Sequence, residues 1–359
     1  MARKLFWLIV VMLGFGLIVL SSASVVQAQK QFGSSSYYWR HQLIFGILPG
    51  LAMLWLLWRV DYRRWRSFAL PGLFCALVLM ILVFVPSFGV HLKGATSWLS
   101  LGVFTFQPAE VLKLALVVYL AAWLGERGDR LKHVRFGLVP FVLVMGFVAV
   151  LLLLQPDLGT LGIVSLLSGG MYFIAGAPLK QVFGVVAAVV ILMGGMAALS
   201  PERWSRITTV FNPGADMRGA GWQLNQSLIA IGSGGMWGVG LGQSTQKLYG
   251  FIPEPIGDSI FAVLVEELGW AGGMFTISLF AIFAIMMTQI ARRARDGFGS
   301  LLVLGMCLWV MIQATVNMAA VTGLGPLTGI PLPFISYGGT SMVAMLAGLG
   351  IVLNVAERT

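Results

Sequence analysis

The sequence has few charged residues and many apolar ones. Asp, Glu, Lys and Arg together make up 10% of the 359 residues, whereas hydrophobic residues make up 58%. A soluble domain carries about 25% charged residues, so this composition excludes an ordinary soluble protein. Apolar runs of roughly 20 residues, enough to cross a bilayer core, recur along the whole chain. We therefore predict an all-α integral membrane protein that forms a single polytopic domain over residues 1–359.

Cysteine is also scarce, and the sequence contains no nucleotide-binding fingerprint. The two cysteines, Cys75 and Cys307, both fall inside apolar runs. Neither has a neighbouring Cys or His, so we expect no structural disulfide and no cysteine-based metal site. The absence of a Walker or Rossmann glycine motif argues against nucleotide-driven transport.

The apolar runs predict about ten transmembrane helices. We expect them at Leu5–Val26, Gln42–Val60, Phe68–Phe88, Pro108–Leu124, Phe136–Leu154, Leu158–Gly176, Gln181–Leu199, Ser259–Ile290, Phe298–Ala320 and Ser336–Val355. An even number of crossings places both termini on the same side of the membrane. The run at Ser259–Ile290 is longer than one crossing requires, so it either tilts or begins outside the bilayer.

The distribution of Lys and Arg indicates which side that is, because cytoplasmic loops carry an excess of basic residues. One set of loops carries most of them: Arg3, Lys4, Arg59, Arg63, Arg64, Arg66, Arg127, Arg130, Lys132, Arg135, Lys180, Arg292, Arg293, Arg295 and Arg358. The opposite set carries Lys30, Arg40, Lys93, Arg203, Arg206, Arg218 and Lys247. Both termini are therefore predicted to be cytoplasmic. The net charge of +10 reflects this topology, not nucleic-acid binding.

The first apolar run admits a second interpretation. It is followed by SSASVVQAQ, which resembles the cleavage region of a signal peptide. Cleavage would leave nine helices and would place the two ends on opposite sides of the membrane. We favour an uncleaved first helix.

The longest connection, from Ser200 to Asp258, lies between the predicted seventh and eighth helices on the outer face. Its many Trp, Phe, Ile and Gly residues argue against disorder, and a long ordered loop is usually functional. We expect this large extracytoplasmic loop, residues 200–258, to carry much of the active site.

Two motifs in this loop have alternative interpretations. In PERWSRITTVFNP, Arg203 and Arg206 share one helix face beside Trp204. Such a helix can anchor on the outer leaflet, or its guanidinium groups can bind a lipid pyrophosphate. The glycine cluster between Gly232 and Gly242 indicates close backbone approach and phosphate binding, or close helix packing.

Ionisable side chains at or inside the predicted spans are functional candidates, because charge is costly in lipid. Asp258 lies at the entrance of the eighth predicted helix, where its alternative role is that of a helix N-cap. Glu110 and Lys113 are three residues apart on one helix, so their side chains can pair.

Three further acidic residues lie at or near the outer boundary. Asp157 follows Pro156 and is expected to cap the next helix. Glu266 and Glu267 lie about two turns into the eighth helix. We expect one of them to line a cavity and the other to be bonded structurally.

Several blocks of sequence resemble the SEDS family of shape, elongation, division and sporulation proteins. In chain order they are GATSWLSLGVFTFQPAEVLKLA, QPDLGT, RWSRITTVFNP, GWQLNQSLIAIGSGG, GVGLGQSTQK, PEPIGDSIFAVLVEELG, NMAAVTGLGPLTGIPLPFISYGGTS and GLGIVLN. Together they are far more specific than any single motif. The phrase AIGSGGMWGVGLGQSTQK is closer to the division branch of the family than to the elongation branch, which is the near alternative.

The resemblance implies a ten-helix glycosyltransferase that polymerises lipid II into peptidoglycan strands at the outer face of the membrane during cell division. The family's catalytic acidic residue aligns with Asp258. A carboxylate there can act as general base, as ligand of a divalent cation (Mg²⁺ or Mn²⁺), or as both. Lys113 matches a lysine implicated in function. Substrate contacts are further expected from Glu110, Asp157, Arg203, Arg206, Gln226, Lys247 and Glu254.

This chain departs from the family pattern at two places. Ser97 occupies a position where the family commonly has an Arg that could bind phosphate, and Lys93 is a candidate replacement. PEPIGD replaces the usual His-Thr-Asp context of Asp258, which calls into question a histidine-assisted proton relay.

The resemblance also implies partners and a location. We expect a class B penicillin-binding transpeptidase, other membrane proteins of the division complex, no nucleic acid, and residence in the bacterial inner membrane at the septum. A lipid II flippase and a noncatalytic division scaffold stay open as alternatives. Transport favours inverted repeats and midplane charges, whereas the polar motifs here cluster at the outer face, which favours catalysis.

Overall fold

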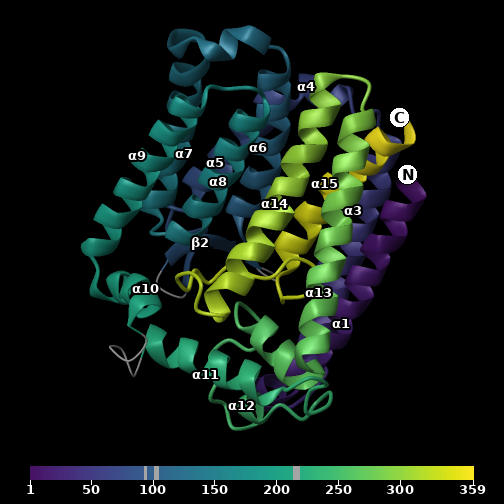
Figure 1. Ribbon diagram of the computed structural model, residues 1–359, viewed down its shortest axis with the longest axis vertical. Coiled ribbons are helices and arrows are strands. Elements are labelled where there is room, and N and C mark those ends of the chain that lie inside the picture. Colours follow the sequence, from purple (N-terminus) through teal and green to yellow (C-terminus); the bar gives the residue numbers. More distant parts are fainter. Residues whose placement is uncertain (93–94, 101–104, 213–218) are drawn as a thin grey trace.

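The computed structural model describes residues 1–92, 95–100, 105–212 and 219–359 and consists mainly of membrane-length helices (Figure 1). Eight helical stretches are long and apolar enough to cross a membrane: Ala2–Phe32 (α1), Tyr37–Arg59, Pro108–Gly125 (α6), Val134–Leu154, Leu179–Ala198 (α9), Ile260–Arg293 (α13), Gly297–Val321 (α14) and Gly339–Glu357 (α15). Two shorter apolar helices complete the set, α5 (Ala69–Leu82) and α8 (Leu158–Ile174). The prediction of ten transmembrane helices is confirmed for the described part of the chain.

Two of these stretches contain a π-helical turn, and short elements connect the rest. Tyr37–Arg59 consists of α2 (Tyr37–Gln42), a π turn (Leu43–Ile47) and α3 (Leu48–Arg59), and Val134–Leu154 consists of a π turn (Val134–Leu138) and α7 (Val139–Leu154). The remaining elements are α4 (Arg64–Ser67), a 3₁₀ turn (Gly128–Lys132), α10 (Pro201–Phe211), α11 (Ala220–Ser233), α12 (Thr245–Leu248), β1 (Gly89–Leu92), β2 (Ala95–Ser100) and β3 (Thr105–Phe106). The strands form an antiparallel sheet in the order β1-β2-β3, which the sequence analysis did not predict.

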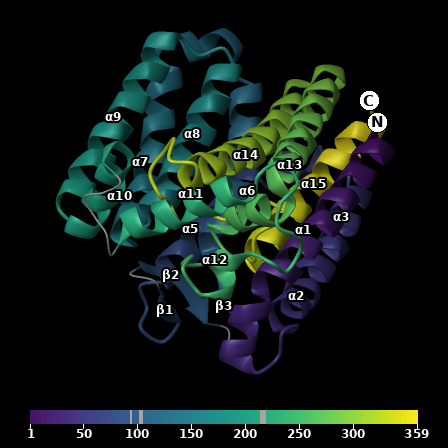
Figure 2. The ribbon, with the colours of Figure 1, turned by 60° about the horizontal axis from the view of Figure 1, so that its bottom comes forward.

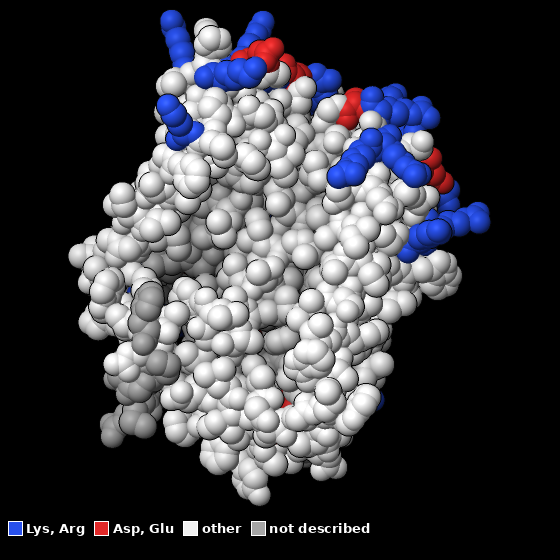
Figure 3. All heavy atoms as spheres, in the orientation of Figure 1, with Lys and Arg blue, Asp and Glu red and all other residues white. Residues whose placement is uncertain are grey.

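The two ends of the molecule differ in charge. Lys and Arg side chains gather at one end, where both chain termini also lie (Figures 1 and 3). Ion pairs join the connections there, including Arg66 to Glu126 and Arg358 to Asp61 at 3.1 Å. Figure 2 turns the opposite end toward the viewer, where α10, α11, α12 and the strands lie. The basic end is therefore the cytoplasmic end, as the Lys and Arg distribution predicts.

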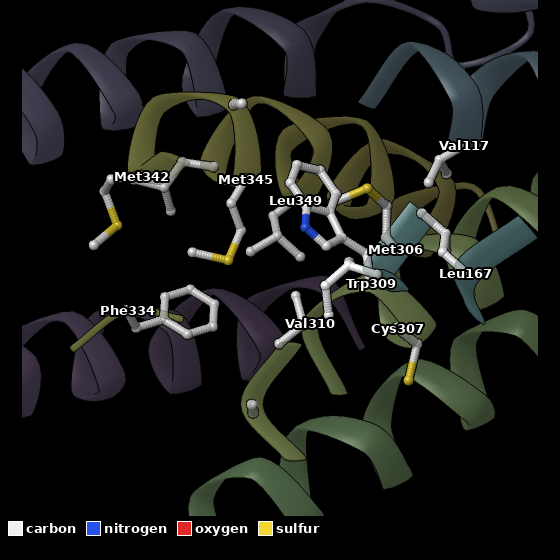
Figure 4. Close-up of a cluster of buried hydrophobic side chains, with 14 of the residues drawn as sticks. Val117, Leu167, Met306, Cys307, Trp309, Val310, Phe334, Met342, Met345 and Leu349 are labelled. Atoms are coloured by element: carbon white, nitrogen blue, oxygen red, sulfur yellow. The ribbon is translucent and has the colours of Figure 1, made fainter. Parts of the chain in front are cut away.

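The core lies between α6, α14, α15 and α3 (Figure 4). Trp309 and Met306 of α14 pack against Met345 and Leu349 of α15. Glycine allows the close approach of helices that packing in lipid requires. A Cβ added at Gly350 of α15 would lie 2.4 Å from a backbone oxygen of α3. By contrast, only 6% of the most apolar 18-residue stretch of α9 is buried inside the protein. Helix α9 therefore lies at the periphery and faces lipid.

The long helix α13 is interrupted near its outer end. Gly269 adopts φ 71° and ψ −173°, so Ile260–Leu268 forms a segment separate from the longer part that follows. Four backbone hydrogen bonds of 2.8–3.1 Å join this break to the loop Gly235–Gly240. The excess length of the predicted eighth helix is thus explained by a break. The glycine cluster provides the close backbone approach that is one of its two predicted roles.

Substitution of Gly238 by Ala is expected to destabilise the protein by about 3 kcal/mol or more, because overpacking and a positive φ both penalise a side chain. Gly238 has φ +80°, and an added Cβ would lie 2.1 Å from the carbonyl oxygen of Glu267. Thermal unfolding of the purified variant in detergent measures the effect. Gly232→Ala is the matched control, because an added Cβ there meets no atom within 4 Å. Equal unfolding temperatures for Gly238→Ala and the native chain would contradict the close contact.

Candidate functional site

Asp258 lies in the loop that leads into α13, at the outer end of the molecule. The helix begins at Ile260 and its N-cap position is Ser259, so Asp258 precedes the cap. The alternative prediction of Asp258 as the N-cap is therefore wrong. Its side chain is half-buried, so part of it is accessible from outside.

The backbone around Asp258 is held by residues that are distant in the sequence. The carbonyl oxygen of Asp258 accepts a hydrogen bond from the side-chain amide of Asn317 at 2.8 Å. The carbonyl of Gly257 accepts one from the hydroxyl of Ser336 at 2.7 Å. The carbonyl of Ile256 accepts one from the backbone N–H of Tyr337 at 2.9 Å. Helix α14 and the segment before α15 thus fix the loop from two sides.

Two amide side chains on one face of α14 connect these parts. Asn317 also donates to the carbonyl of Ile330 at 2.7 Å, and Gln313, one turn earlier, donates to the carbonyl of Pro331 at 3.0 Å. Sequence analysis did not identify either residue. An amide in an otherwise apolar membrane helix is itself a functional signal, and that signal could have located both.

Lys113 and Glu110 form the predicted ion pair on α6. The ammonium nitrogen of Lys113 lies 2.7 Å from a carboxylate oxygen of Glu110, and both side chains are almost fully buried. Lys113 also donates to the side-chain carbonyl of Gln313 at 3.1 Å and lies 5.2 Å from the centre of the Trp309 ring. Through Gln313 the pair is joined to the same segment that holds the Asp258 loop. Lys113 and Asp258 therefore belong to one connected polar network.

Asp157 caps α8, as predicted. Its carboxylate accepts hydrogen bonds from the backbone N–H of Thr160 at 3.0 Å and from the Thr160 hydroxyl at 2.8 Å. Burial raises the pKa of Asp157, and the Thr160 hydrogen bonds and the charge of Lys113 oppose that shift in part. Asp157 thus lies within electrostatic reach of the Lys113–Glu110 pair. Its capping role and a substrate contact are compatible.

The two loop arginines lie on the surface helix α10. Arg206 pairs with Glu202 at 3.0 Å, and both side chains are exposed. Trp204 is also exposed. No described hydrogen bond or ion pair joins α10 to the Asp258 loop. This arrangement is that of an interfacial helix, and a phosphate contact by Arg203 or Arg206 stays a prediction.

Lys247 lies in a buried cluster at the break of α13. Its ammonium group makes an ion pair with Glu267 and donates to the carbonyl and the hydroxyl of Ser22 in α1, at 2.9 and 3.2 Å. These three acceptors use all three donors of the ammonium. Such an arrangement favours a structural role for Lys247 over a contact with substrate.

Both adjacent glutamates, Glu266 and Glu267, are bonded to other parts of the protein. Glu266 accepts hydrogen bonds from the hydroxyl of Ser244, the hydroxyl and backbone N–H of Thr245 and the backbone N–H of Gln246, at 2.5–3.3 Å. Both Glu266 and Glu267 are almost fully buried. The structural bonding expected for one of them is seen for both, since Glu266 binds the outer loop and Glu267 binds Lys247 and Ser22. A cavity-lining role for either carboxylate stays a prediction.

Glu254 and Gln226 lie in the two segments beside Asp258. Glu254 adopts φ 52°, and its carbonyl oxygen accepts from the backbone N–H groups of Gly257 and Ser259 at 3.1 and 3.4 Å, so it forms the turn that presents Asp258. Gln226 lines an open groove of about 470 Å³ along α11, together with Trp222, Asn225, Leu228 and Ile229. The groove lies on the same helix as Gln223, which contacts Asp258.

The departure from the family pattern at Ser97 is only partly described. Ser97 is buried in β2. Lys93, its candidate replacement as a phosphate ligand, lies outside the described residues.

The described residues offer no protein-only metal site. Nowhere among them do three or more His, Cys, Asp or Glu side chains come close enough to hold a metal ion. Among these residues, a divalent cation at Asp258 would therefore depend on at most two such side chains together with oxygens of a substrate, an arrangement that Mg²⁺ accepts.

We expect Lys247→Met to lower the free energy of unfolding by about 3–5 kcal/mol, because it leaves the buried carboxylate of Glu267 without its partner. The double variant Lys247→Met, Glu267→Gln should recover most of this loss, since no buried charge remains unpaired. Unfolding in detergent measures both variants. A double variant no more stable than Lys247→Met would contradict the structural ion pair.

Comparisons with known proteins agree with one another. A family described as FTSW_RODA_SPOVE, cell cycle protein, matches residues 3–359. The chain is 39% identical over 352 residues to "probable peptidoglycan glycosyltransferase FtsW" of Trichlorobacter lovleyi, which covers 97% of this chain and 91% of that protein. It is 38% identical to "stage V sporulation protein E" of Bacillus subtilis, over 96% of this chain and 94% of that protein.

Two solved structures have the same fold. One belongs to work described as "structural coordination of polymerization and crosslinking by a peptidoglycan synthase complex", with a TM-score of 0.82 and 28% identity over 99% of this chain and 97% of that chain. The other is the rod shape determining protein RodA of Thermus thermophilus, with a TM-score of 0.73 and 27% identity over 99% of this chain and 96% of that chain.

Proposed function

The chain belongs to the FtsW/RodA/SpoVE family of cell cycle proteins, also called SEDS, and on that premise we propose that it is a peptidoglycan glycosyltransferase. It is a multi-pass protein of the inner membrane and polymerises lipid II into glycan strands at the outer face. The similarity to FtsW proteins over 97% of the chain supports a role in division. The single observation that carries the proposal is the placement of a half-buried carboxylate, Asp258, at the junction of α11, α13, α14 and the segment before α15.

Asp258 acts as the general base of the transfer. A sugar hydroxyl is a poor nucleophile, and a carboxylate within hydrogen-bond reach accepts its proton as it attacks. The 4-hydroxyl of the acceptor N-acetylglucosamine forms a bond to the anomeric carbon of the lipid-linked muramyl donor. The bond from that carbon to the pyrophosphate oxygen breaks, the anomeric centre inverts, and undecaprenyl pyrophosphate leaves. One carboxylate is enough, because this leaving group needs charge neutralisation more than it needs a proton.

Lys113 is the best-placed basic residue for that neutralisation within the part of the chain that the structure describes. It lies in the second turn of α6, near the outer end of the helix, and belongs to the network that includes Asp258. Its partner Glu110 has a second carboxylate oxygen that is buried without a hydrogen-bond partner among the described residues, which suits an acceptor for a substrate hydroxyl. A divalent cation held by Asp258 and the pyrophosphate would supply further positive charge.

The arrangement of polar groups supports catalysis over transport. Glu110, Lys113, Asp157 and Asp258 all lie at the outer ends of their helices, whereas a transporter places its site near the midplane. A scaffold alone would have no use for a half-buried carboxylate on a loop whose backbone is held by three hydrogen bonds from α14 and the segment before α15. We further propose a class B penicillin-binding transpeptidase as partner and the division septum as location, supported by the similarity to a chain of a peptidoglycan synthase complex.

We expect Asp258→Asn to abolish polymer formation from lipid II, with a loss of at least about 100-fold, because the amide cannot accept the proton. The assay uses the purified protein reconstituted with its transpeptidase and Mg²⁺. Asp129→Asn is the control, because Asp129 is exposed on a cytoplasmic turn. Equal polymer from Asp258→Asn and the native chain would remove Asp258 from the mechanism. No polymer from the native chain, together with measurable lipid II translocation, would favour the flippase.

Removal of divalent cations with a chelator should reduce polymer formation by the native chain, and added Mg²⁺ or Mn²⁺ should restore it. The physical reason is the charge of the pyrophosphate, which the described protein cations balance only in part. Polymer length and initial rate measured on denaturing gels report the effect. Full activity in the chelator would leave Asp258 with the role of base alone.

A further inference from the structure

Aromatic side chains gather at the outer end of the molecule, where the proposed mechanism does not use them. Two pairs of rings are stacked there. The ring of Phe32 lies on that of Tyr37, with centroids 3.7 Å apart and an interplanar angle of 11°, and the rings of Tyr249 and Phe251 are 5.7 Å apart at 28°. All four side chains are exposed, Tyr249 by 72%. Apolar side chains that are grouped on a surface mark an interaction site.

The two pairs belong to one surface. The first pair connects the end of α1 to the start of α2, and the second pair follows α12. Helices α1 and α12 are in contact. A Cβ added at Gly250, which separates the two rings of the second pair, would lie 3.8 Å from the ammonium nitrogen of Lys30. Lys30 is two residues before Phe32, so its side chain joins the two pairs.

The same surface continues to the Asp258 loop through Trp222 of α11. The indole N–H of Trp222 donates to the carbonyl of Phe251 at 3.1 Å, and its side chain is 38% exposed. The next residue, Gln223, places its amide nitrogen 3.3 Å from a carboxylate oxygen of Asp258. Figure 2 shows α11, α12 and the joined ends of α1 and α2 on this outer face. We call the five exposed rings the aromatic track: Trp222, Phe251, Tyr249, Phe32 and Tyr37.

The track lies beyond the hydrocarbon core of the membrane. Helix α1 has 31 residues. At about 1.5 Å per residue it is about 46 Å long, whereas the hydrocarbon core is about 30 Å thick. Arg3 and Lys4 hold its first turn at the cytoplasmic surface, so Phe32 extends past the outer boundary, and α11 and α12 lie at the outermost end of the molecule (Figure 1). Interfacial anchors are mainly Trp and Tyr, so exposed phenylalanines here favour a ligand over membrane anchoring.

Stacked rings of this kind suit a sugar polymer. A pyranose ring presents C–H bonds on one face, and these pack against the electron-rich face of an aromatic ring. The hydroxyl and acetamido groups stay in water at the edge of the contact. A β-1,4-linked strand presents such faces repeatedly, so successive rings along a surface match it better than a single pocket does. The exposed ammonium of Lys30 adds a positive charge that attracts the carboxylates of stem peptides.

We propose that the aromatic track binds the growing glycan strand where it leaves the Asp258 loop. This inference rests on the proposed function, because that function supplies the strand. A strand held on the track stays at a high effective concentration near Asp258 between successive transfers. The track therefore raises the number of sugars that are added before the strand is released.

The first test measures binding without catalysis. The full chain in nanodiscs is titrated with chitohexaose, six β-1,4-linked N-acetylglucosamines without peptide, and saturation-transfer NMR reports the affinity. Tyr249→Ala and Tyr37→Ala should each weaken binding by about 5-fold, because each removes one ring. Tyr249→Phe keeps the ring and should restore the native affinity. Trp237→Ala is the matched control, because Trp237 is an aromatic of the outer loop that is 82% exposed and is not part of the track.

The second test measures the length of the strands made from lipid II. In Tyr249→Ala and Tyr37→Ala the median length should fall by about 5-fold, in proportion to the lost affinity. The initial rate of lipid II consumption should fall less than the length, because the first transfers produce strands too short to reach the whole track. Tyr249→Phe and Trp237→Ala should give native lengths.

The outcomes separate this inference from the proposed function. Native affinity for chitohexaose in both alanine variants would overturn the track, even where Asp258→Asn abolishes polymer formation. Weaker affinity with strands of native length would also overturn it. Capture of the transpeptidase that is lost in these variants while chitohexaose still binds would make the surface a protein interface instead. Full activity in Asp258→Asn would reject the proposed role of Asp258, and the chitohexaose titration would still decide whether the track binds a glycan.

Discussion

The constraint on which this structure depends is that backbone groups in a membrane must find hydrogen-bond partners within the protein. Helices satisfy this internally, but the functional end of this molecule is built from non-helical segments. Asn and Gln side chains donate the hydrogen bonds that carbonyl groups in these segments need. Asn317 donates to two carbonyl groups, at Asp258 and Ile330, and Gln313 donates to a third at Pro331. The same device recurs elsewhere: Gln155 donates to the carbonyl of Met80 at 2.8 Å.

The non-helical segments near the outer face hold polar groups at positions that regular helices do not provide. The segment before α15, the loop before α13 and the break at Gly269 all leave the helical conformation near the outer face. Amide side chains of α14 hold the segment before α15 and the loop before α13, and backbone hydrogen bonds from the loop Gly235–Gly240 hold the break. The polar groups therefore keep fixed positions even though most of the surrounding surface is apolar. This explains how a chain with 10% charged residues can maintain one connected polar network.

The two buried lysines show how position decides the role of a charge. Lys113 and Lys247 are both almost fully buried and both are paired with a glutamate. The ammonium group of Lys247 uses all three of its N–H donors for contacts within the protein, and it joins α1 to the break of α13. Lys113 is joined through Gln313 to the segment that holds Asp258, beside a glutamate oxygen without a protein partner among the described residues. The Lys247–Glu267 pair therefore stabilises the fold, and the Lys113–Glu110 pair is the one that we propose to contact the substrate.

The sequence by itself determined the membrane class, the ten helices, the topology and the Glu110–Lys113 pair, because these depend on local composition and spacing. It also made Asp258 the candidate catalytic residue, through its motif. It did not determine the contacts of Gln223, Gln313 and Asn317, the small sheet, or the break at Gly269. It also did not show that Lys247 and Glu267 form a buried cluster with Ser22, or that Glu266 binds Ser244 and Thr245. These features depend on contacts between residues that are far apart in the chain, such as the 220-residue separation of Ser22 and Gly242. Only the tertiary structure decides which amide meets which carbonyl, because in lipid every such group must find a partner and the sequence does not specify which one is near.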